Sequence, residues 1–166
     1  MKLFAELATY YLNKPFSTDD FETLPAVIRK YTDWDYTYQQ KSEGCLLKPT
    51  FRNMPYRNSF VPEIDMVISN RDSETELQML GQPVKFVRVF MALWFGFLLV
   101  MEGFLVILAI TSSLDSLLPL FIPLAMSAFG YLLCKLATKA AFNSVVKAIK
   151  KEFILQSNPN LSNTFP

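Results

Sequence analysis

The sequence contains no histidine, and only two cysteines, Cys45 and Cys134, occur among its 166 residues. Histidine is the side chain that most often serves as a base near neutral pH and as a metal ligand, so its absence removes the commonest chemistry of both kinds. Two cysteines far apart in the chain do not make a zinc site, and we expect both thiols to be packing residues. The sequence therefore predicts no metal and no cofactor.

Catalytic motifs are missing as well. The chain has only five glycines and no glycine-rich loop, and no nucleophile has a candidate base beside it. Glu63 and Asp65 alternate on one face of a predicted strand, which is typical of a solvated strand face rather than of paired catalytic carboxylates. We therefore expect a protein that is not an enzyme.

Neither sign of charge is in excess, because 16 basic and 15 acidic residues give a net charge of +1. The aromatic residues of the predicted strand region are interspersed with acids, which would repel phosphates. The sequence thus argues against nucleic acid as a partner. These acids are Asp33, Asp35, Glu43, Glu63, Asp65, Asp72, Glu74 and Glu76.

Two long apolar runs stand out, from Val89 to Ile110 and from Leu117 to Leu136. They contain about 22 and about 20 residues, close to the length that a helix needs to cross a hydrocarbon core of roughly 30 Å. Only a short polar segment, 111–116, separates them. The sequence predicts a two-helix transmembrane hairpin.

The connecting segment 111–116 has no lysine or arginine, whereas basic residues gather before the first run and after the second. By the positive-inside rule, both termini are cytoplasmic and the connecting segment is outside. The same basic residues could also bind anionic lipid, and the sequence leaves the two roles open. They are Lys85, Arg88, Lys135, Lys139, Lys147, Lys150 and Lys151.

Glu102 lies in the middle of the first apolar run, where an ionised carboxylate costs about 2.5 to 3.5 kcal/mol. Ser127 lies at a comparable depth in the second run and is the nearest candidate partner within the chain. A polar contact between helices or protomers is the first interpretation, and an ion or proton path is the second.

Residues 1–83 carry the patterns of a small cytoplasmic α+β domain. Met1 to Asn13 has apolar residues at near-helical spacing and predicts a short amphipathic helix, and a second helix runs to about Tyr31. From Trp34 onward the apolar period becomes two, which predicts an antiparallel meander of about four strands. Gly81-Gln82-Pro83 is expected to end the last strand.

The predicted fold is therefore an α+β membrane protein with four parts. A small cytoplasmic antiparallel β-meander with N-terminal helices precedes a two-helix transmembrane hairpin and a juxtamembrane amphipathic helix. The expected ranges are 1–83 for the domain, 84–136 for the hairpin, 137–155 for the amphipathic helix and 156–166 for a disordered tail.

The stretch Tyr56-Arg57-Asn58-Ser59-Phe60-Val61-Pro62 ahead of the hairpin resembles uncharacterised small bacterial membrane proteins with an Arg-Asn-Ser-Phe-x-Pro element. The resemblance covers about 44–135 and implies a bacterial source, hence location in the inner (cytoplasmic) membrane. It implies no activity. Arg57, Asn58 and Ser59 become candidates for an interaction site or for bracing the loop that enters the next strand.

We therefore expect a membrane-anchored interaction or regulatory module with a protein partner, which could also form a homo-oligomer. An immunity or accessory protein of a bacterial antagonism or defence system is one concrete version. The alternative is an oligomeric channel or transporter subunit that uses Glu102.

The predicted orientation can be tested by cysteine labelling in a background without the two native cysteines. Ser113→Cys should react with a membrane-impermeant maleimide in intact cells, and Ser157→Cys should react only after permeabilisation, because the flanking positive charge stays inside. The opposite pattern would mean that the orientation is inverted.

Overall fold

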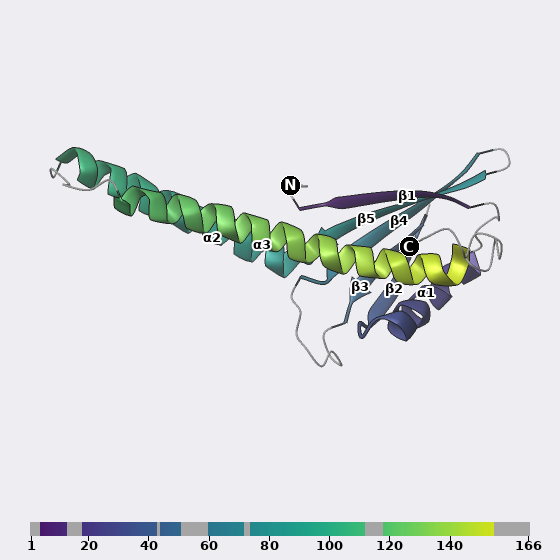
Figure 1. Cartoon of the computed structure of the whole chain (residues 1–166). Helices are drawn as coiled ribbons and strands as arrows, with labels where there is room; N and C mark the ends of the chain where they lie inside the picture. The colour runs from purple at the N-terminus through teal and green to yellow at the C-terminus, as the bar shows by residue number, and fades with distance from the viewer. Residues whose placement is uncertain are drawn as a thin grey trace.

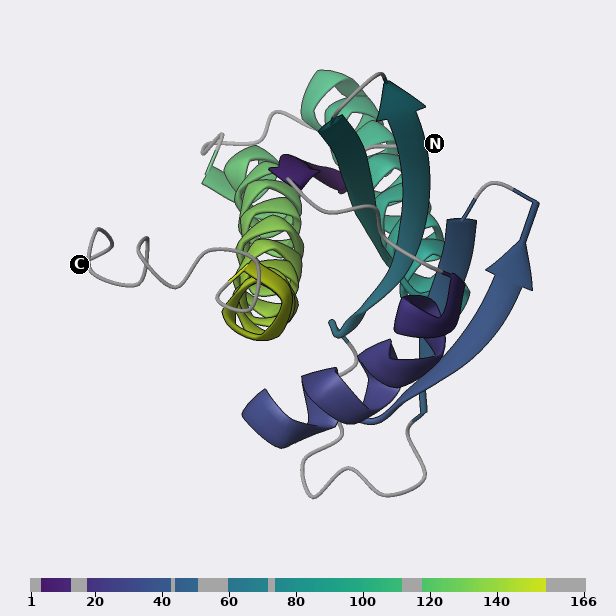
Figure 2. The same cartoon turned by 90° about the vertical axis from the view of Figure 1, so that its right-hand side faces the viewer.

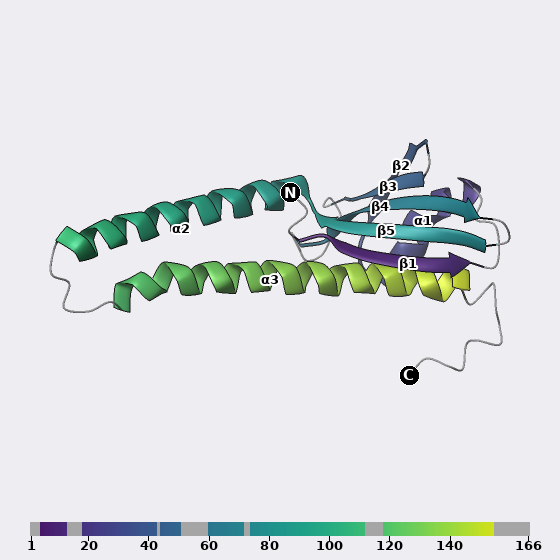
Figure 3. The same ribbon diagram turned by 90° about the horizontal axis from the view of Figure 1, so that it is seen from above.

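The protein, seen here in a computed structural model, is described for residues 4–12, 18–42, 44–50, 60–71, 74–111 and 118–154. A five-stranded antiparallel sheet carries helices on one face, and a long helical hairpin projects from one end of it (Figures 1 and 3). The elements are β1 (Glu6–Leu12), α1 (Thr18–Tyr31), β2 (Tyr36–Lys41), β3 (Gly44–Pro49), β4 (Pro62–Arg71), β5 (Glu74–Pro83), α2 (Lys85–Thr111), α3 (Leu118–Ile149) and a π-helical turn, η1 (Lys150–Ile154).

The sheet has the order β1-β5-β4-β3-β2, so the predicted four-strand meander is confirmed as β2 to β5. The fifth strand corrects the sequence analysis, because Glu6–Leu12 is a strand and not part of an amphipathic helix. It pairs antiparallel with β5, with Leu7 opposite Leu80. Ala8 and Tyr10 pack against the core while Leu7 is exposed, which is the period of a strand. A segment this short fits both a helical and a strand period, and it forms a strand because β5 offers an unpaired edge to which it can bond.

The end of β5 is a second correction. The strand continues through Gly81-Gln82 to Pro83, where the sequence predicted a break. Pro83 lies opposite Pro62, the first residue of β4. Since neither proline has an N–H to donate, the ladder between these strands ends at this pair, and Val84 leads directly into α2.

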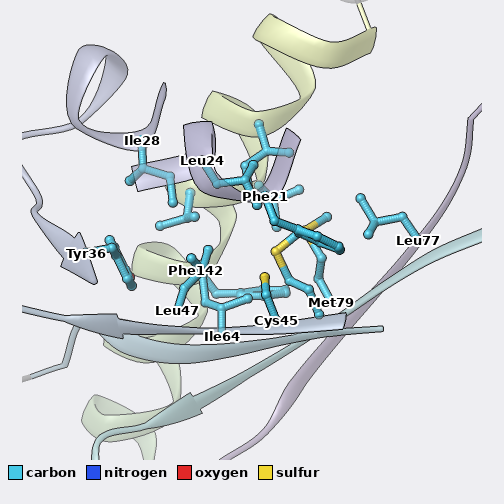
Figure 4. Close-up of a cluster of buried hydrophobic side chains, with 14 of the residues drawn as sticks. Phe21, Leu24, Ile28, Tyr36, Cys45, Leu47, Ile64, Leu77, Met79 and Phe142 are labelled. Atoms are coloured by element: carbon cyan, nitrogen blue, oxygen red, sulfur yellow. The ribbon is translucent and has the colours of Figure 1, made fainter. Parts of the chain in front are cut away.

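One face of the sheet is covered by α1 and by the C-terminal half of α3 (Figure 2). Helix α1 contains Pro25 without interruption and turns Phe21, Leu24 and Ile28 toward the sheet, at the spacing of one helical face. Figure 4 shows these three side chains above Cys45, Leu47 and Ile64 of the sheet. Helix α1, which precedes the meander, thus covers part of one of its faces.

Helix α3 is continuous across residue 136, where the hairpin was expected to give way to a juxtamembrane helix. Its last turns carry Phe142, Val145, Val146 and Ile149, and all four are buried in the core between the helices and the sheet. The apolar stripe of the expected amphipathic helix therefore packs on the sheet. One helix belongs both to the hairpin and to the domain.

The π-helical turn η1, which continues α3, is joined to α1 by polar contacts. The Glu152 carboxylate accepts hydrogen bonds from the Tyr31 hydroxyl at 2.6 Å and from Lys30 Nζ at 3.1 Å. These two donors, Tyr31 first, lower the pKa of Glu152 below its usual range. The ammonium group of Lys151 lies 4.7 Å from the centre of the Tyr31 ring. The two helices are thus joined at the end of the domain that is remote from the hairpin.

Helix α2 and the segment Phe121–Phe153 are long and apolar enough to cross a membrane. Only 6 % of the most apolar stretch of α2 and 17 % of that of the second segment are buried within the protein. A core helix of a soluble protein would be mostly buried, and large exposed apolar surfaces are typical of contact with a membrane or a partner.

Gly81 permits the close approach of α3 to the sheet. A Cβ at this position would overlap the ring of Phe142, which is itself 2 % exposed. We expect Gly81→Ala to lower the free energy of unfolding by about 1 to 3 kcal/mol, because an overpacked core must shift the ring and its helix. Denaturant unfolding in detergent micelles measures this change.

Gly96→Ala is the matched control, since a Cβ at Gly96 has no atom within 4 Å in the described part of the chain. It should leave the stability unchanged or slightly raised. Equal effects of the two substitutions would contradict the packing of α3 on Gly81.

Candidate functional site

Three features of the described residues are candidates for function: a groove in the hairpin, the junction between sheet and hairpin, and the sheet face that the helices leave open. The groove has a volume of about 560 Å³ and lies between α2 and α3. Glu102 and Ser127 both line it, so the structure brings the two predicted polar residues to one place. The remaining lining is glycine or apolar: Phe95, Leu98, Leu99, Gly103, Val106, Pro123 and Leu124.

The two polar residues share the groove without a hydrogen bond between them. Oε2 of Glu102 is buried and has no partner among the described residues. A buried acceptor without a donor costs free energy in an apolar setting, so the carboxyl group lacks a stabilising contact within the described chain. The structure therefore places Glu102 and Ser127 in the same groove, and a hydrogen bond between them stays a prediction.

The junction is the place where β5 passes into α2 and α3 runs alongside. Phe4 packs here among Val84, Val87, Met91 and Cys134, all buried. Its ring lies 5.5 Å from that of Tyr131 on α3. Phe4, two residues before β1, thus packs between both helices of the hairpin. The sequence analysis missed this role because it assigned the N-terminal segment to a helix.

Arg88 is the polar residue that connects the junction to the sheet. Its Nη1 donates a hydrogen bond to Oε1 of Gln82 at 3.2 Å, and its Nη2 lies 3.7 Å from the Glu63 carboxylate. Gln82 and Glu63 lie opposite each other on β5 and β4. Lys85, one turn earlier on α2, is exposed. Arg88 is therefore held in a defined place, whereas Lys85 forms no hydrogen bond or ion pair with the described part of the chain.

The predicted basic residues fall into two groups. Lys85, Arg88, Lys135 and Lys139 lie on α2 and α3 near the junction. Lys147, Lys150 and Lys151 follow along α3 and η1, so that Lys151 is about 22 Å from Leu136 at the rise of an α-helix. Lys150 lies 4.1 Å from the centre of the Tyr10 ring on β1. The second group thus belongs to the remote end of the domain.

The open face of the sheet carries the outward residues of all five strands. Leu7, Leu80, Asp65, Leu46 and Gln39 stand opposite one another in a single row across the sheet. Asp65 forms an ion pair with Lys41 at 2.7 Å. In the next row Val67 is 40 % exposed, and Leu7 at the sheet edge is 67 % exposed. The face combines exposed apolar side chains with ion pairs, Glu63 and Asp65 among them.

The cysteines take the predicted role of packing residues. Cys45 and Cys134 are free thiols, and both are fully buried. Burial raises the pKa of the Cys45 thiol to about 12, and the neighbouring Asp65 carboxylate adds to the shift. A protonated, inaccessible thiol is a poor nucleophile. Within the described ranges, no group of three histidine, cysteine, aspartate or glutamate side chains gathers in a way that could hold a metal ion.

Arg57, Asn58 and Ser59 lie in the segment 51–59, outside the described residues, as do the segment 112–117 and the tail 156–166. Comparisons of the whole chain with protein-family models, with curated proteins and with solved structures gave no match. Any function must therefore be argued from the groove, the junction and the open face.

Replacement of Glu102 distinguishes the two roles that the groove suggests. Glu102→Gln should preserve folding and oligomeric state, because the amide keeps a donor and an acceptor. Glu102→Leu should weaken any contact that this group makes with a helix of a second protomer by about 0.6 to 2 kcal/mol, as expected for one hydrogen bond between membrane helices. Thermal unfolding and oligomeric state in mild detergent, measured side by side, report the difference.

Val106→Leu, another change in the groove lining, serves as the control and should alter neither quantity. An unchanged assembly and stability in Glu102→Leu would show that this residue is not a packing contact. Ion conductance across a planar bilayer that is lost in Glu102→Gln would favour the ion path instead.

Proposed function

We propose that this chain is a non-enzymatic protein of the bacterial inner membrane that presents an interaction module to a protein partner in the cytoplasm. The hairpin of α2 and α3 crosses the bilayer, and the sheet with α1 lies on the cytoplasmic side. The exposed apolar length of both helices and the absence of basic residues from 111–116 support this arrangement. An immunity or accessory protein is one form that such a module takes.

The open face of the sheet is the observation that carries the proposal. An antiparallel sheet can leave one face in water, and that face is then usually polar. Here Leu7 and Val67 are exposed and Leu46 and Leu80 are half-buried, beside the Lys41–Asp65 pair. Apolar side chains rimmed by polar and charged ones are typical of a protein-binding surface.

The continuity of α3 supports a module that is rigidly placed. The same helix packs against α2 in the hairpin and against the sheet in the core. The open face is therefore held at a fixed position relative to the membrane. A flexible linker between anchor and domain would leave this position undefined, and no such linker separates β5 from α2, because Val84 alone lies between them.

A second function is supported by the groove between α2 and α3. Glu102 and Ser127 line it together, and one carboxyl oxygen lacks a partner within the described chain. An oligomer that gathers several Glu102 residues would form a channel or transporter subunit. The proposal of an interaction module comes first because a proton path needs several polar groups in series, and the described lining of the groove offers two.

The interaction module can be tested by photo-crosslinking in cells. A photoreactive amino acid at Val67, on the open face, should give one discrete adduct that contains a cytoplasmic or membrane protein identified by mass spectrometry. The same photoreactive amino acid at position 26, where the native Ala26 is exposed on α1, should give no adduct. Leu7→Glu, introduced into the protein that carries the photoreactive amino acid at position 67, should reduce the yield of the adduct, since a carboxylate buried without a partner weakens an apolar contact.

The membrane fraction is followed in parallel for every variant. Adducts at Ala26 and Val67 alike, or an adduct that Leu7→Glu leaves unchanged, would overturn the assignment of the open face. Release of the unmodified protein from membranes by alkaline carbonate would overturn the membrane location.

A further inference from the structure

A pocket of about 340 Å³ lies at the junction, on the side of α2 that faces Phe4. This volume is at the lower end of the roughly 300 to 1,000 Å³ that small-molecule sites occupy. Two basic side chains and five apolar ones form its lining: Phe4, Lys85, Arg88, Val89, Met91, Ala92 and Phe95. The basic groups and the apolar groups are separated along the pocket.

The separation follows from the spacing of residues on α2. Lys85, Arg88, Val89 and Ala92 recur at intervals of three and four, so they share one face of the helix. The basic residues come first, next to the sheet, and the apolar residues follow toward the centre of the predicted span. A ligand that fits this lining has an anionic end and an apolar chain.

The charge at the basic end is positive. Glu63 lies 3.7 Å from Arg88 Nη2, but no acidic side chain of the described chain forms an ion pair with Lys85. Nε of Arg88 is buried and has no hydrogen-bond partner among the described residues. A guanidinium group carries five N–H donors, and Gln82 and Glu63 are placed beside only two of its nitrogens, so a group that is already positioned keeps donors for an oxygen of a ligand.

The apolar end is open to the surroundings of the hairpin. Val89 is 49 % exposed and Ala92 is also exposed, so a chain lying there is not enclosed by protein. Because the predicted span begins at about Val89, Lys85 and Arg88 come at the level of lipid headgroups. The surroundings of the pocket would then be the cytoplasmic leaflet of the membrane.

We propose that this pocket binds one anionic phospholipid of the cytoplasmic leaflet. The phosphate lies between Lys85 and Arg88, and one acyl chain lies along Val89, Ala92 and Phe95. The proposal rests on the membrane location proposed above. It adds a specific ligand to that location, because a bound lipid would be held by Phe4, which precedes β1, and by α2 at once.

The test is native mass spectrometry of the full chain in detergent micelles that contain equimolar phosphatidylglycerol and phosphatidylcholine. The protein should retain one phosphatidylglycerol in preference to phosphatidylcholine. Lys85→Gln should reduce this preference about fivefold, the factor that corresponds to about 1 kcal/mol for one basic residue near the membrane surface. Lys85 is exposed and forms no hydrogen bond or ion pair with the described residues, so the variant should unfold at the temperature of the original protein.

Lys139→Gln is the matched control, because Lys139 is an exposed basic residue near the junction that does not line the pocket. It should leave the preference unchanged. Ala92→Trp fills the apolar part while both charges remain, and it should lower the fraction of protein that retains a lipid. Glycerol 3-phosphate, the soluble part of the headgroup, should not displace the lipid, because it lacks the chain.

Equal effects of Lys85→Gln and Lys139→Gln would overturn the site, since they would indicate general surface charge. Displacement of the lipid by glycerol 3-phosphate, together with unchanged lipid retention in Ala92→Trp, would also overturn the site, in favour of a site for free phosphate. Equal retention of the two lipids by a protein that resists carbonate extraction would sink the lipid site alone. Extraction by carbonate would sink the proposed membrane location instead.

Discussion

The structure depends on a single helix, α3, that packs against α2 in the hairpin and against the sheet in the domain. Helix α3 presents apolar side chains to α2 along its first half and buries Phe142, Val145, Val146 and Ile149 against the sheet along its last turns. The absence of a side chain at Gly81 lets the ring of Phe142 reach the strand. Since the helix has no break at residue 136, a shift of the sheet must move the hairpin as well. The domain and the hairpin are in this sense a single body.

The sequence predicted those elements whose pattern is settled locally. The two apolar runs, the helix that ends at Tyr31 and the alternation in β2 to β5 each fix their own structure. The strand β1 could not be predicted in this way, because a segment of only seven residues with this mixture of apolar and polar side chains fits either period. Its assignment depends on β5, which lies more than sixty residues later in the chain and offers an unpaired edge. The sequence of β1 alone does not show that it pairs with a strand so distant in the chain.

The same limit applies to the candidate sites. Glu102 was recognised from the sequence because a charge within an apolar run conflicts with its surroundings. Lys85 and Arg88 were recognised by charge, but the pocket beside them needs Phe4, which reaches the junction only because β1 is a strand. Lys150 and Lys151 looked equivalent to Lys135 until the length of α3 placed them beside Tyr10 and Tyr31. Contacts with residues distant in sequence decide each of these cases.

Arg88 connects the two surfaces to which we assign ligands. Its guanidinium group lines the junction pocket, and it contacts Gln82 and Glu63, a cross-strand pair whose side chains belong to the open face. An anionic lipid in the pocket would lie beside this cation together with Glu63, so its phosphate would add negative charge at the membrane end of the open face. A partner that binds that end with a basic side chain would favour the lipid-bound state. By thermodynamic linkage the lipid must then favour the partner by the same factor. The membrane surface would in this way set the affinity of the module for its partner.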